Sequence, residues 1–145
     1  MSVAVAKLAP GPGNVGLVDR PEREPGAGYV RLTVLAAGVC GTDLHIEAGE
    51  YPSVPPVTMG HEVCGVVETL GPGADSAWEG ERVVSETYFA TCGACALCRA
   101  GRPNLCERRQ SIGTHVDGAF TARVVVPARG LTASPCRRWP RLPRP

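Results

Sequence analysis

The sequence predicts a mainly β fold, a small and partly open barrel with little helix. The 145-residue chain holds 18 Gly and 14 Pro but only seven aromatic residues, a composition that favours short strands and turns over long helices. Runs of β-branched residues also recur at close spacing, separated by turns rich in glycine and proline. A chain of this length is typical of a single domain and can bury one hydrophobic core.

The first half of the chain is predicted to form strands joined by turns. The first strand is "SVAVAK", followed by the turn "APGPGNVG" and the short returning strand "LVDRP". From Gly28 onward, Val30, Leu32 and Val34 alternate with polar or aromatic residues, which is typical of a half-buried strand. The stretch "CGTDLHIEAG" that begins at Cys40 is predicted to contain one helical turn.

The second half continues the same pattern. The runs "HEVCGVVETLG" and "ERVVSETYF" predict two strands, and the turn "PGADSAWEG" separates them. A cysteine-rich loop over residues 92–106 follows, and "GAFTARVVVPARG" predicts the last strand.

Gly11, Gly13 and Gly16 form a G-x-G-x-x-G pattern after a predicted strand, which nominally indicates a dinucleotide site. Such a site requires a following helix whose N-terminus holds the pyrophosphate. Pro21 and Pro25 stand where that helix should run, and proline lacks a backbone donor. We therefore predict a hairpin turn here.

Four thiols lie within the fifteen residues "CGACALCRAGRPNLC", and three interpretations compete for them. Disulfides are disfavoured in a reducing compartment. A thioredoxin-like redox pair needs one C-x-x-C at the start of a helix near a βαβ unit. Two successive C-x-x-C spacings and a further cysteine instead favour a closed four-thiolate zinc site, which is structural because it leaves no position for substrate. The predicted ligands are Cys92, Cys95, Cys98 and Cys106.

A sparser set upstream predicts a second metal site. Cys40 and His61 are residue types that a catalytic zinc takes as ligands, with one position left open. Glu62 is the third candidate, although neighbouring residues of a regular strand face opposite sides. Either an irregular backbone at Gly60 lets both His61 and Glu62 ligate, or Glu62 contacts a ligand instead of the metal.

Thr42, Asp43 and His45, which follow Cys40 in the chain, are candidates for assisting the metal and its ligands. Thr42 and His45 share one face of a helical turn, so a hydroxyl and an imidazole can form a proton path from a metal-bound alcohol to solvent. Asp43 can accept the second ring N–H of His61 and so orient that ligand.

At these residues the chain resembles the N-terminal catalytic domain of the zinc-dependent medium-chain alcohol dehydrogenases, in their polyol and threonine dehydrogenase branch. The matching stretches occur in the family's order and span most of residues 1–131. They are "GVCGTDLH", "GHEVCGVVETLG", "GERVV", the four-cysteine loop and "DGAFTARVVVP".

The resemblance implies a GroES-like barrel with a short zinc-binding lobe and two zinc sites. It assigns the structural zinc to the four clustered cysteines, and the catalytic zinc to Cys40, His61 and Glu62. It also implies a proton relay through Thr42 and His45. In this family the metal acts as a Lewis acid on a small-molecule alcohol, whose hydride passes to NAD or NADP.

The charge and the hydrophobicity of the chain also indicate which kinds of binding partner are not expected. The net charge is +1, and four arginines in residues 134–145 leave −3 for the first 133 residues, which does not favour nucleic-acid binding. No apolar run approaches the ~20 residues of a membrane span, and the N-terminus lacks the basic start of a signal peptide. We expect a cytoplasmic protein, and the resemblance is compatible with a homo-oligomer in the full-length form.

Residues 132–145 are predicted to form an irregular basic tail rich in proline and arginine, after a catalytic domain over residues 1–131. The family continues into a nucleotide-binding Rossmann domain at this point, so we expect a truncation or a reading-frame shift here. Fourteen Arg against one Lys is typical of a GC-rich gene, in which a shifted frame yields Arg, Pro and Trp.

Without a Rossmann domain the nicotinamide pocket would be missing, and we expect this chain alone to be inactive. The alternative function is a zinc-binding structural or interaction module without catalysis.

Overall fold

The computed structural model describes residues 1–134, while residues 135–145, which hold most of the predicted basic tail, lie outside the described part. Within residues 1–134 no helix is long and apolar enough to span a membrane. In chain order the strands and helices are β1 (Ser2–Lys7), β2 (Val15–Arg20), β3 (Tyr29–Gly38), α1 (Gly41–Glu47), β4 (Val57–Thr58), β5 (Glu62–Leu70), β6 (Arg82–Ser85), β7 (Tyr88–Ala90), α2 (Ala96–Arg99), β8 (Gln110–Ser111), β9 (Arg123–Pro127) and β10 (Leu131–Ala133).

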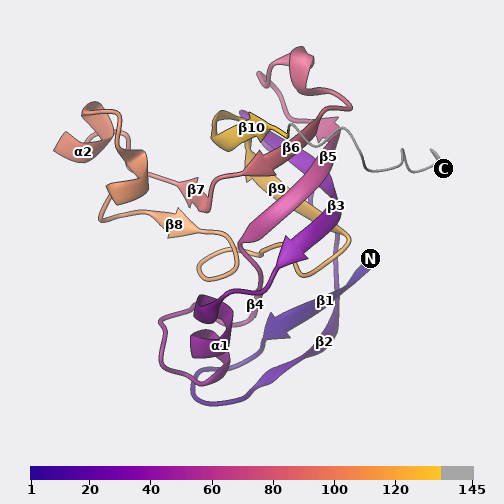
Figure 1. Ribbon diagram of the computed structural model, residues 1–145, viewed down its shortest axis with the longest axis vertical. Coiled ribbons are helices and arrows are strands. Elements are labelled where there is room, and N and C mark those ends of the chain that lie inside the picture. Colours follow the sequence, from indigo (N-terminus) through magenta and orange to yellow (C-terminus); the bar gives the residue numbers. More distant parts are fainter. Residues whose placement is uncertain (135–145) are drawn as a thin grey trace.

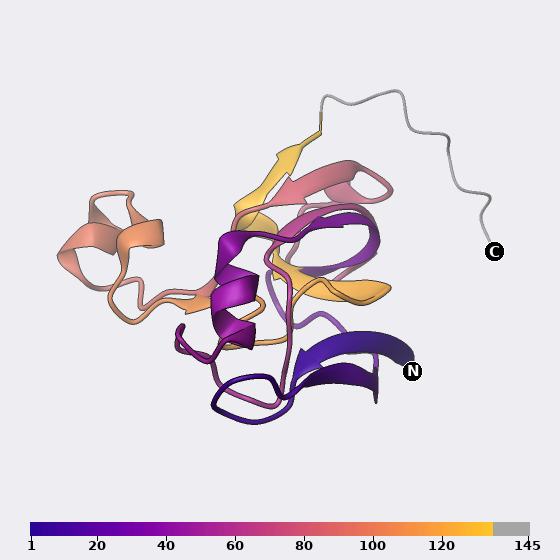
Figure 2. The ribbon, with the colours of Figure 1, turned by 60° about the horizontal axis from the view of Figure 1, so that its bottom comes forward.

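The strands form three antiparallel sheets that do not close into one barrel. The largest has the order β10-β6-β5-β3-β9, and a three-stranded sheet has the order β2-β1-β4. The pair β7-β8 carries an arm that projects from the body and ends at α2 (Figure 1). In the turned view α1 lies across the front of the body, between this arm and the other strands (Figure 2). The mainly β, partly open architecture predicted from the sequence is confirmed.

The core lies on the inner face of the five-stranded sheet. The alternation predicted in β3 is confirmed, because Val30 and Leu32 are fully buried. Burial of this apolar surface at about 25 cal/mol per Å² is the main force that holds the sheets together. The buried core cluster consists of Val30, Leu32, Val63, Val67, Val83, Ile112, Ala119, Val124 and Val126.

The glycine pattern before Gly16 is a hairpin loop, as predicted. Strands β1 and β2 pair antiparallel up to Lys7 and Val15, and the chain between them turns back. Gly11 and Gly13 have positive φ angles of 87° and 66°, which glycine adopts without steric cost. No helix follows the pattern, so the conformation required of a dinucleotide site is absent here.

Helix α1 is longer than the single turn predicted from the sequence. It runs over seven residues from Gly41 to Glu47, and Cys40 is its N-cap. The backbone N–H of Cys40 donates to Asp43 Oδ2 at 3.1 Å, and the N–H of Thr42 donates to Cys40 Sγ at 3.2 Å. These reciprocal caps and the fully buried Ile46 hold a helix too short to be stable alone.

A ladder of charges crosses three strands on the outer face of the large sheet. Glu68 on β5 accepts hydrogen bonds from Arg123 Nε of β9 at 2.9 Å and from Arg31 Nε of β3 at 3.2 Å. Desolvation opposes the ionisation of Glu68, but the hydrogen bonds and charges of Arg123 and Arg31 outweigh it, so its pKa is lowered.

We predict that Glu68→Gln lowers the free energy of unfolding by about 0.5–1 kcal/mol at pH 7. A carboxylate with a lowered folded-state pKa stabilises the fold above its unfolded pKa of about 4.3, and this contribution is lost as the pH falls through the folded value. The difference should therefore shrink as the pH falls in urea unfolding of both proteins between pH 7 and pH 3.5. Glu81→Gln, which changes an exposed carboxylate with no ion pair among residues 1–134, is the control. A Glu68→Gln deficit that is constant with pH would contradict this prediction.

Candidate metal centres

The four clustered cysteines lie in the lobe at the end of the β7-β8 arm (Figure 1). Cys95 is the N-cap of α2, and a short 3₁₀ turn over Pro103–Leu105 leads to Cys106. Gly93 and Gly101 take positive φ angles of 68° and 73°, which allows the chain to fold tightly around the thiols. Residues 92–106 thus form a compact loop that gathers all four sulfur atoms.

The sulfur positions fit one tetrahedral ion. The four Sγ atoms all lie within 4.8 Å of one another, with Cys92 at 3.6 Å from Cys106 and at 3.9 Å from Cys98. Four sulfurs at about 2.3 Å from a zinc ion stand about 3.8 Å apart in a tetrahedron. A disulfide requires about 2.05 Å between its sulfurs, and all four cysteines are free thiols. The arrangement is that of a closed metal site.

Two of the four thiols have shifted pKa values, in opposite directions, because their surroundings differ. Backbone N–H groups of Ala94 and Cys95 lower the pKa of the Cys92 thiol to about 6. Desolvation, followed by a hydrogen bond with Cys95, raises the pKa of the Cys98 thiol to about 11. Clustered thiols cannot all ionise side by side without a cation, and a divalent ion that binds them displaces the remaining protons.

The second centre joins two segments that are distant in the sequence. Cys40 stands at the N-terminus of α1, and its Sγ lies 3.1 Å from Nε2 of His61, just before β5. The other ring nitrogen of His61, Nδ1, faces Oδ1 of the buried Asp43 at 3.7 Å. These two buried atoms have no hydrogen-bond partner at shorter range in the described residues. Asp43 therefore lies where it can orient the His61 ring.

Glu62 brings the third donor to this centre. A carboxylate oxygen of Glu62, Cys40 Sγ and a ring nitrogen of His61 all lie within 4.8 Å of one another. Glu62 pairs with Gly38 across β5 and β3, and a Cβ atom added at Gly38 would collide with Oε2 of Glu62. The Glu62 carboxylate thus folds back over a position that only glycine leaves open. Sequence reasoning missed Gly38, since nothing in the local pattern indicates which residue lies opposite Glu62.

A cluster of glycines fixes the backbone that presents His61. Gly60 has a φ of 89°, and its carbonyl accepts a hydrogen bond from the Ala119 N–H at 2.9 Å. A Cβ atom at Gly113 or Gly118 would strike the backbone of Gly60, so the turn over residues 113–118 packs directly on it. This irregular backbone is one of the two options that the sequence left open for His61 and Glu62.

Thr42 and His45 lie on α1 beside the centre, but no hydrogen bond joins them within the described chain. The His45 side chain is 62% exposed, and its Nδ1 lies 2.7 Å from Oε2 of Glu50. The His45 side chain therefore lies on the solvent-exposed face of α1. Sequence reasoning missed Glu50, which no helical spacing connects to His45.

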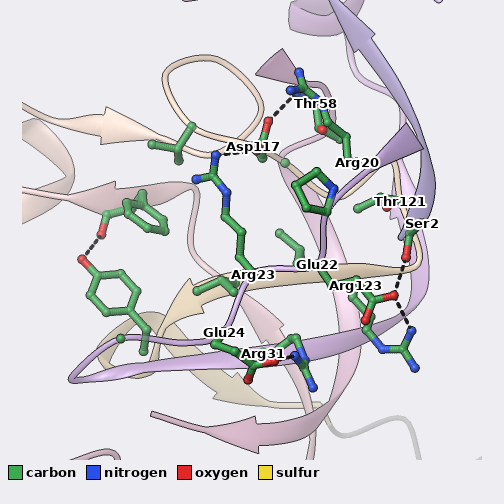
Figure 3. A pocket seen from close by; sticks show the side chains of 18 residues that line it. Ser2, Arg20, Glu22, Arg23, Glu24, Arg31, Thr58, Asp117, Thr121 and Arg123 are labelled. Atoms are coloured by element: carbon green, nitrogen blue, oxygen red, sulfur yellow. Dashed lines mark hydrogen bonds and ion pairs between the residues drawn. The ribbon is translucent and has the colours of Figure 1, made fainter. Parts of the chain in front are cut away.

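A separate hollow of about 330 Å³ lies beside β2, β9 and the chain that follows β2 (Figure 3). No candidate metal ligand lines it. The Nε and Nη2 atoms of Arg20, which also borders the hollow, are buried and have no partner within the described chain. Three other arginines at the hollow pair with carboxylates, and these pairs are Arg23–Asp117, Arg31–Glu24 and Arg123–Glu22.

Comparison with known proteins identifies a family whose members are similar to this chain. The sequence profile of the family described as Alcohol dehydrogenase GroES-like domain matches residues 26–136. The sorbitol dehydrogenase of Halalkalibacterium halodurans is 39% identical over 128 residues, which are 88% of this chain and 37% of that enzyme. The L-threonine 3-dehydrogenase of Pyrococcus horikoshii is 40% identical over 137 residues, which are 92% of this chain and 39% of that enzyme.

Solved structures agree with these sequence relatives. The thermostable alcohol dehydrogenase of Pyrobaculum aerophilum, solved with cobalt and zinc bound, superposes with a TM-score of 0.83 at 34% identity. That match covers 93% of this chain and 42% of the other. The chain therefore spans about two fifths of the length of the proteins that it matches.

We predict that Gly38→Ala weakens metal binding at the Cys40, His61 and Glu62 centre by about tenfold or more, while the fold survives. The added methyl group displaces the end of a flexible side chain and leaves the backbone in place. Titration with Co²⁺ measures the affinity, and thermal unfolding measures the stability. Gly26→Ala adds a methyl group into open space and is the control. Unchanged Co²⁺ affinity in Gly38→Ala would exclude Glu62 as a ligand.

Cys98→Ser is predicted to remove one metal ion per chain and to disorder the lobe. Zinc binding in small peptides amounts to about 10–16 kcal/mol, as much as the stability of a whole domain. Hydrogen exchange should speed up over residues 92–106, while Val30 and Val67 in the core stay protected. Cys64→Ser removes a thiol outside both centres and should keep all metal. A protected lobe in Cys98→Ser would show that the metal is not what holds it.

Proposed function

The chain belongs to the family of alcohol dehydrogenase GroES-like domains, and we propose that it is the catalytic-domain portion of a zinc-dependent dehydrogenase. The proposed reaction is oxidation of a small alcohol or polyol, with hydride transfer to NAD or NADP. The observation that carries the proposal is the 3.1 Å approach of Cys40 Sγ to His61 Nε2, with the Glu62 carboxylate beside them. Such a three-donor set leaves a fourth position for a substrate oxygen.

In this proposal Cys40, His61 and Glu62 hold the catalytic zinc, which when bound supplies Lewis-acid polarisation of an alcohol oxygen. Asp43 Oδ1, at 3.7 Å from His61 Nδ1, would accept the Nδ1–H when the ion is bound, and the lone pair of Nε2 would then face the ion. Donor type supports zinc, because a thiolate, an imidazole and a carboxylate are its usual ligands. Cys92, Cys95, Cys98 and Cys106 hold the structural zinc.

The proposed proton path leads from the centre along α1. The Thr42 hydroxyl takes the alcohol proton, and His45 passes it to solvent because its ring is exposed. The Glu50 carboxylate, at 2.7 Å from Nδ1, holds the His45 ring in position at the surface.

The nicotinamide cofactor is proposed to bind between this domain and a further nucleotide-binding domain, which would correspond to the part of its relatives beyond the matched two fifths of their length. A polypeptide of residues 1–145 alone should therefore show negligible dehydrogenase activity. A cytoplasmic location is also part of the proposal, because the thiolate ligands must stay reduced. Assembly into a homo-oligomer remains a prediction for a longer form.

Metal analysis separates this function from the alternative of a zinc-binding structural or interaction module. The purified chain should contain about two zinc ions, and Cys40→Ser should contain about one. One zinc in the wild type, unchanged in Cys40→Ser, would support the module. Alcohol-dependent reduction of NAD or NADP by this chain alone would contradict the predicted inactivity.

A further inference from the structure

We propose that Lys7 is a positioning residue for the Cys40, His61 and Glu62 centre. The inference rests on the proposed function, in which these three residues bind a metal. Lys7 contacts none of them, and it acts on the two segments that carry Cys40 and His61.

Lys7 is the only lysine of the chain, and its side chain is 1% exposed. A lysine is almost never fully buried without a partner. Its Nζ donates to three backbone carbonyls, those of Gly11 and Gly13 at 2.5 Å and that of Glu47 at 3.1 Å. An ammonium group has three donors, so this cage of carbonyls satisfies all of them. No carboxylate within residues 1–134 pairs with Lys7, and its charge is neutralised only by these carbonyl dipoles.

The third carbonyl of the cage belongs to the last residue of α1. The Glu47 carbonyl also accepts from the Gly13 N–H at 2.8 Å, so both the side chain of Lys7 and the hairpin loop hold this helix end. The last carbonyls of a helix lack partners inside it, and a cation there is favourable. Gly49, just after α1, packs so closely on Gly11 that a Cβ atom would not fit. The hairpin loop lies directly against the end of α1 in both ribbon views (Figures 1 and 2).

The main chain of Lys7 is tied to the other ligand segment. Lys7 pairs with Val57 of β4, and Val5 accepts a hydrogen bond from the Met59 N–H at 2.9 Å. The chain then continues through Gly60 to His61. The backbone of β1 therefore fixes the approach to His61, while the Lys7 side chain fixes the helix that begins at Cys40.

A helix of seven residues is about 10 Å long, so a change at its C-terminus moves its N-terminus as a rigid body. The sulfur of Cys40 must stay close to the His61 ring for both to bind one ion. Removal of the Lys7 ammonium would take the donor from the carbonyls of Gly11 and Gly13. It would leave the Glu47 carbonyl with the Gly13 N–H alone and so loosen the end of α1. The predicted effect is a displaced thiolate rather than a lost ligand.

The first test compares Lys7→Met and Lys7→Arg in titrations with Co²⁺. The four-thiolate and three-ligand centres contain different numbers of thiolates, so their charge-transfer bands report on each centre separately. We expect Lys7→Met to weaken binding at the three-ligand centre by about tenfold or more and to change its spectrum, with the four-thiolate bands unchanged. Lys7→Arg keeps the charge and should recover part of the affinity. Arg20→Met, which removes another long cation from the same hairpin, is the matched control, because no hydrogen bond of the described residues joins the buried Arg20 Nε and Nη2 to α1.

The second test needs no folded Lys7 variant. Selective ¹⁵N-lysine labelling gives a single ammonium resonance, because the chain has one lysine. If the Lys7 contacts favour metal binding, then metal binding must favour the Lys7 contacts to the same extent. Zinc at the three-ligand centre should therefore slow exchange of the Lys7 ammonium protons by about fivefold or more. In Cys40→Ser, where zinc binds only the lobe, no slowing is expected.

The results separate this inference from the proposed function. Two metal ions in the wild type, with unchanged Co²⁺ affinity and spectrum in Lys7→Met, would overturn the role of Lys7 alone. Equal ammonium exchange with and without zinc would overturn it as well. A wild-type chain that binds a single ion would contradict the proposed function, and the inference with it.

Discussion

The approach of Cys40 to His61 is the constraint on which the candidate catalytic centre depends. The thiol and the imidazole lie 3.1 Å apart, although 21 positions separate them in the chain. Each comes from a different local structure, the N-cap of α1 and the residue that precedes β5. Neither structure makes a metal site alone, so the site exists only because the sheets hold α1 against the start of β5.

Glycines make this approach sterically feasible. At Gly38 the missing side chain leaves room for the Glu62 carboxylate, and at Gly118 it lets a neighbouring turn press on the Gly60 carbonyl. Substitution at these positions would act on the geometry of the ligands before it acts on the core. The hairpin loop and the carbonyl cage of Lys7 then hold the opposite end of α1. Several local contacts thus act together to position the donor atoms of Cys40, His61 and Glu62.

The two metal centres are built on different principles. The four-thiolate lobe takes all its donors from fifteen consecutive residues, and its own loop brings the sulfurs to within 4.8 Å of one another. It projects on the two-stranded arm of β7 and β8 (Figure 1), and in the proposed function metal binding holds it together. The three-donor centre instead depends on the sheets, which hold α1 and the start of β5 in place. The first is therefore suited to stabilising a lobe and the second to chemistry at an open position.

The sequence alone determined what depends on nearby residues. Strand alternation from Val30, the hairpin at Gly11 and Gly13, and the thiol cluster follow from local spacing, because neighbouring residues and short loops fix them. Tertiary structure alone decided that Gly38 lies under Glu62, that Glu50 reaches His45 and that Lys7 reaches Glu47. These contacts depend on strand register and on the packing of α1 against a loop. Both arise from burial of the whole core, which no local stretch of sequence encodes.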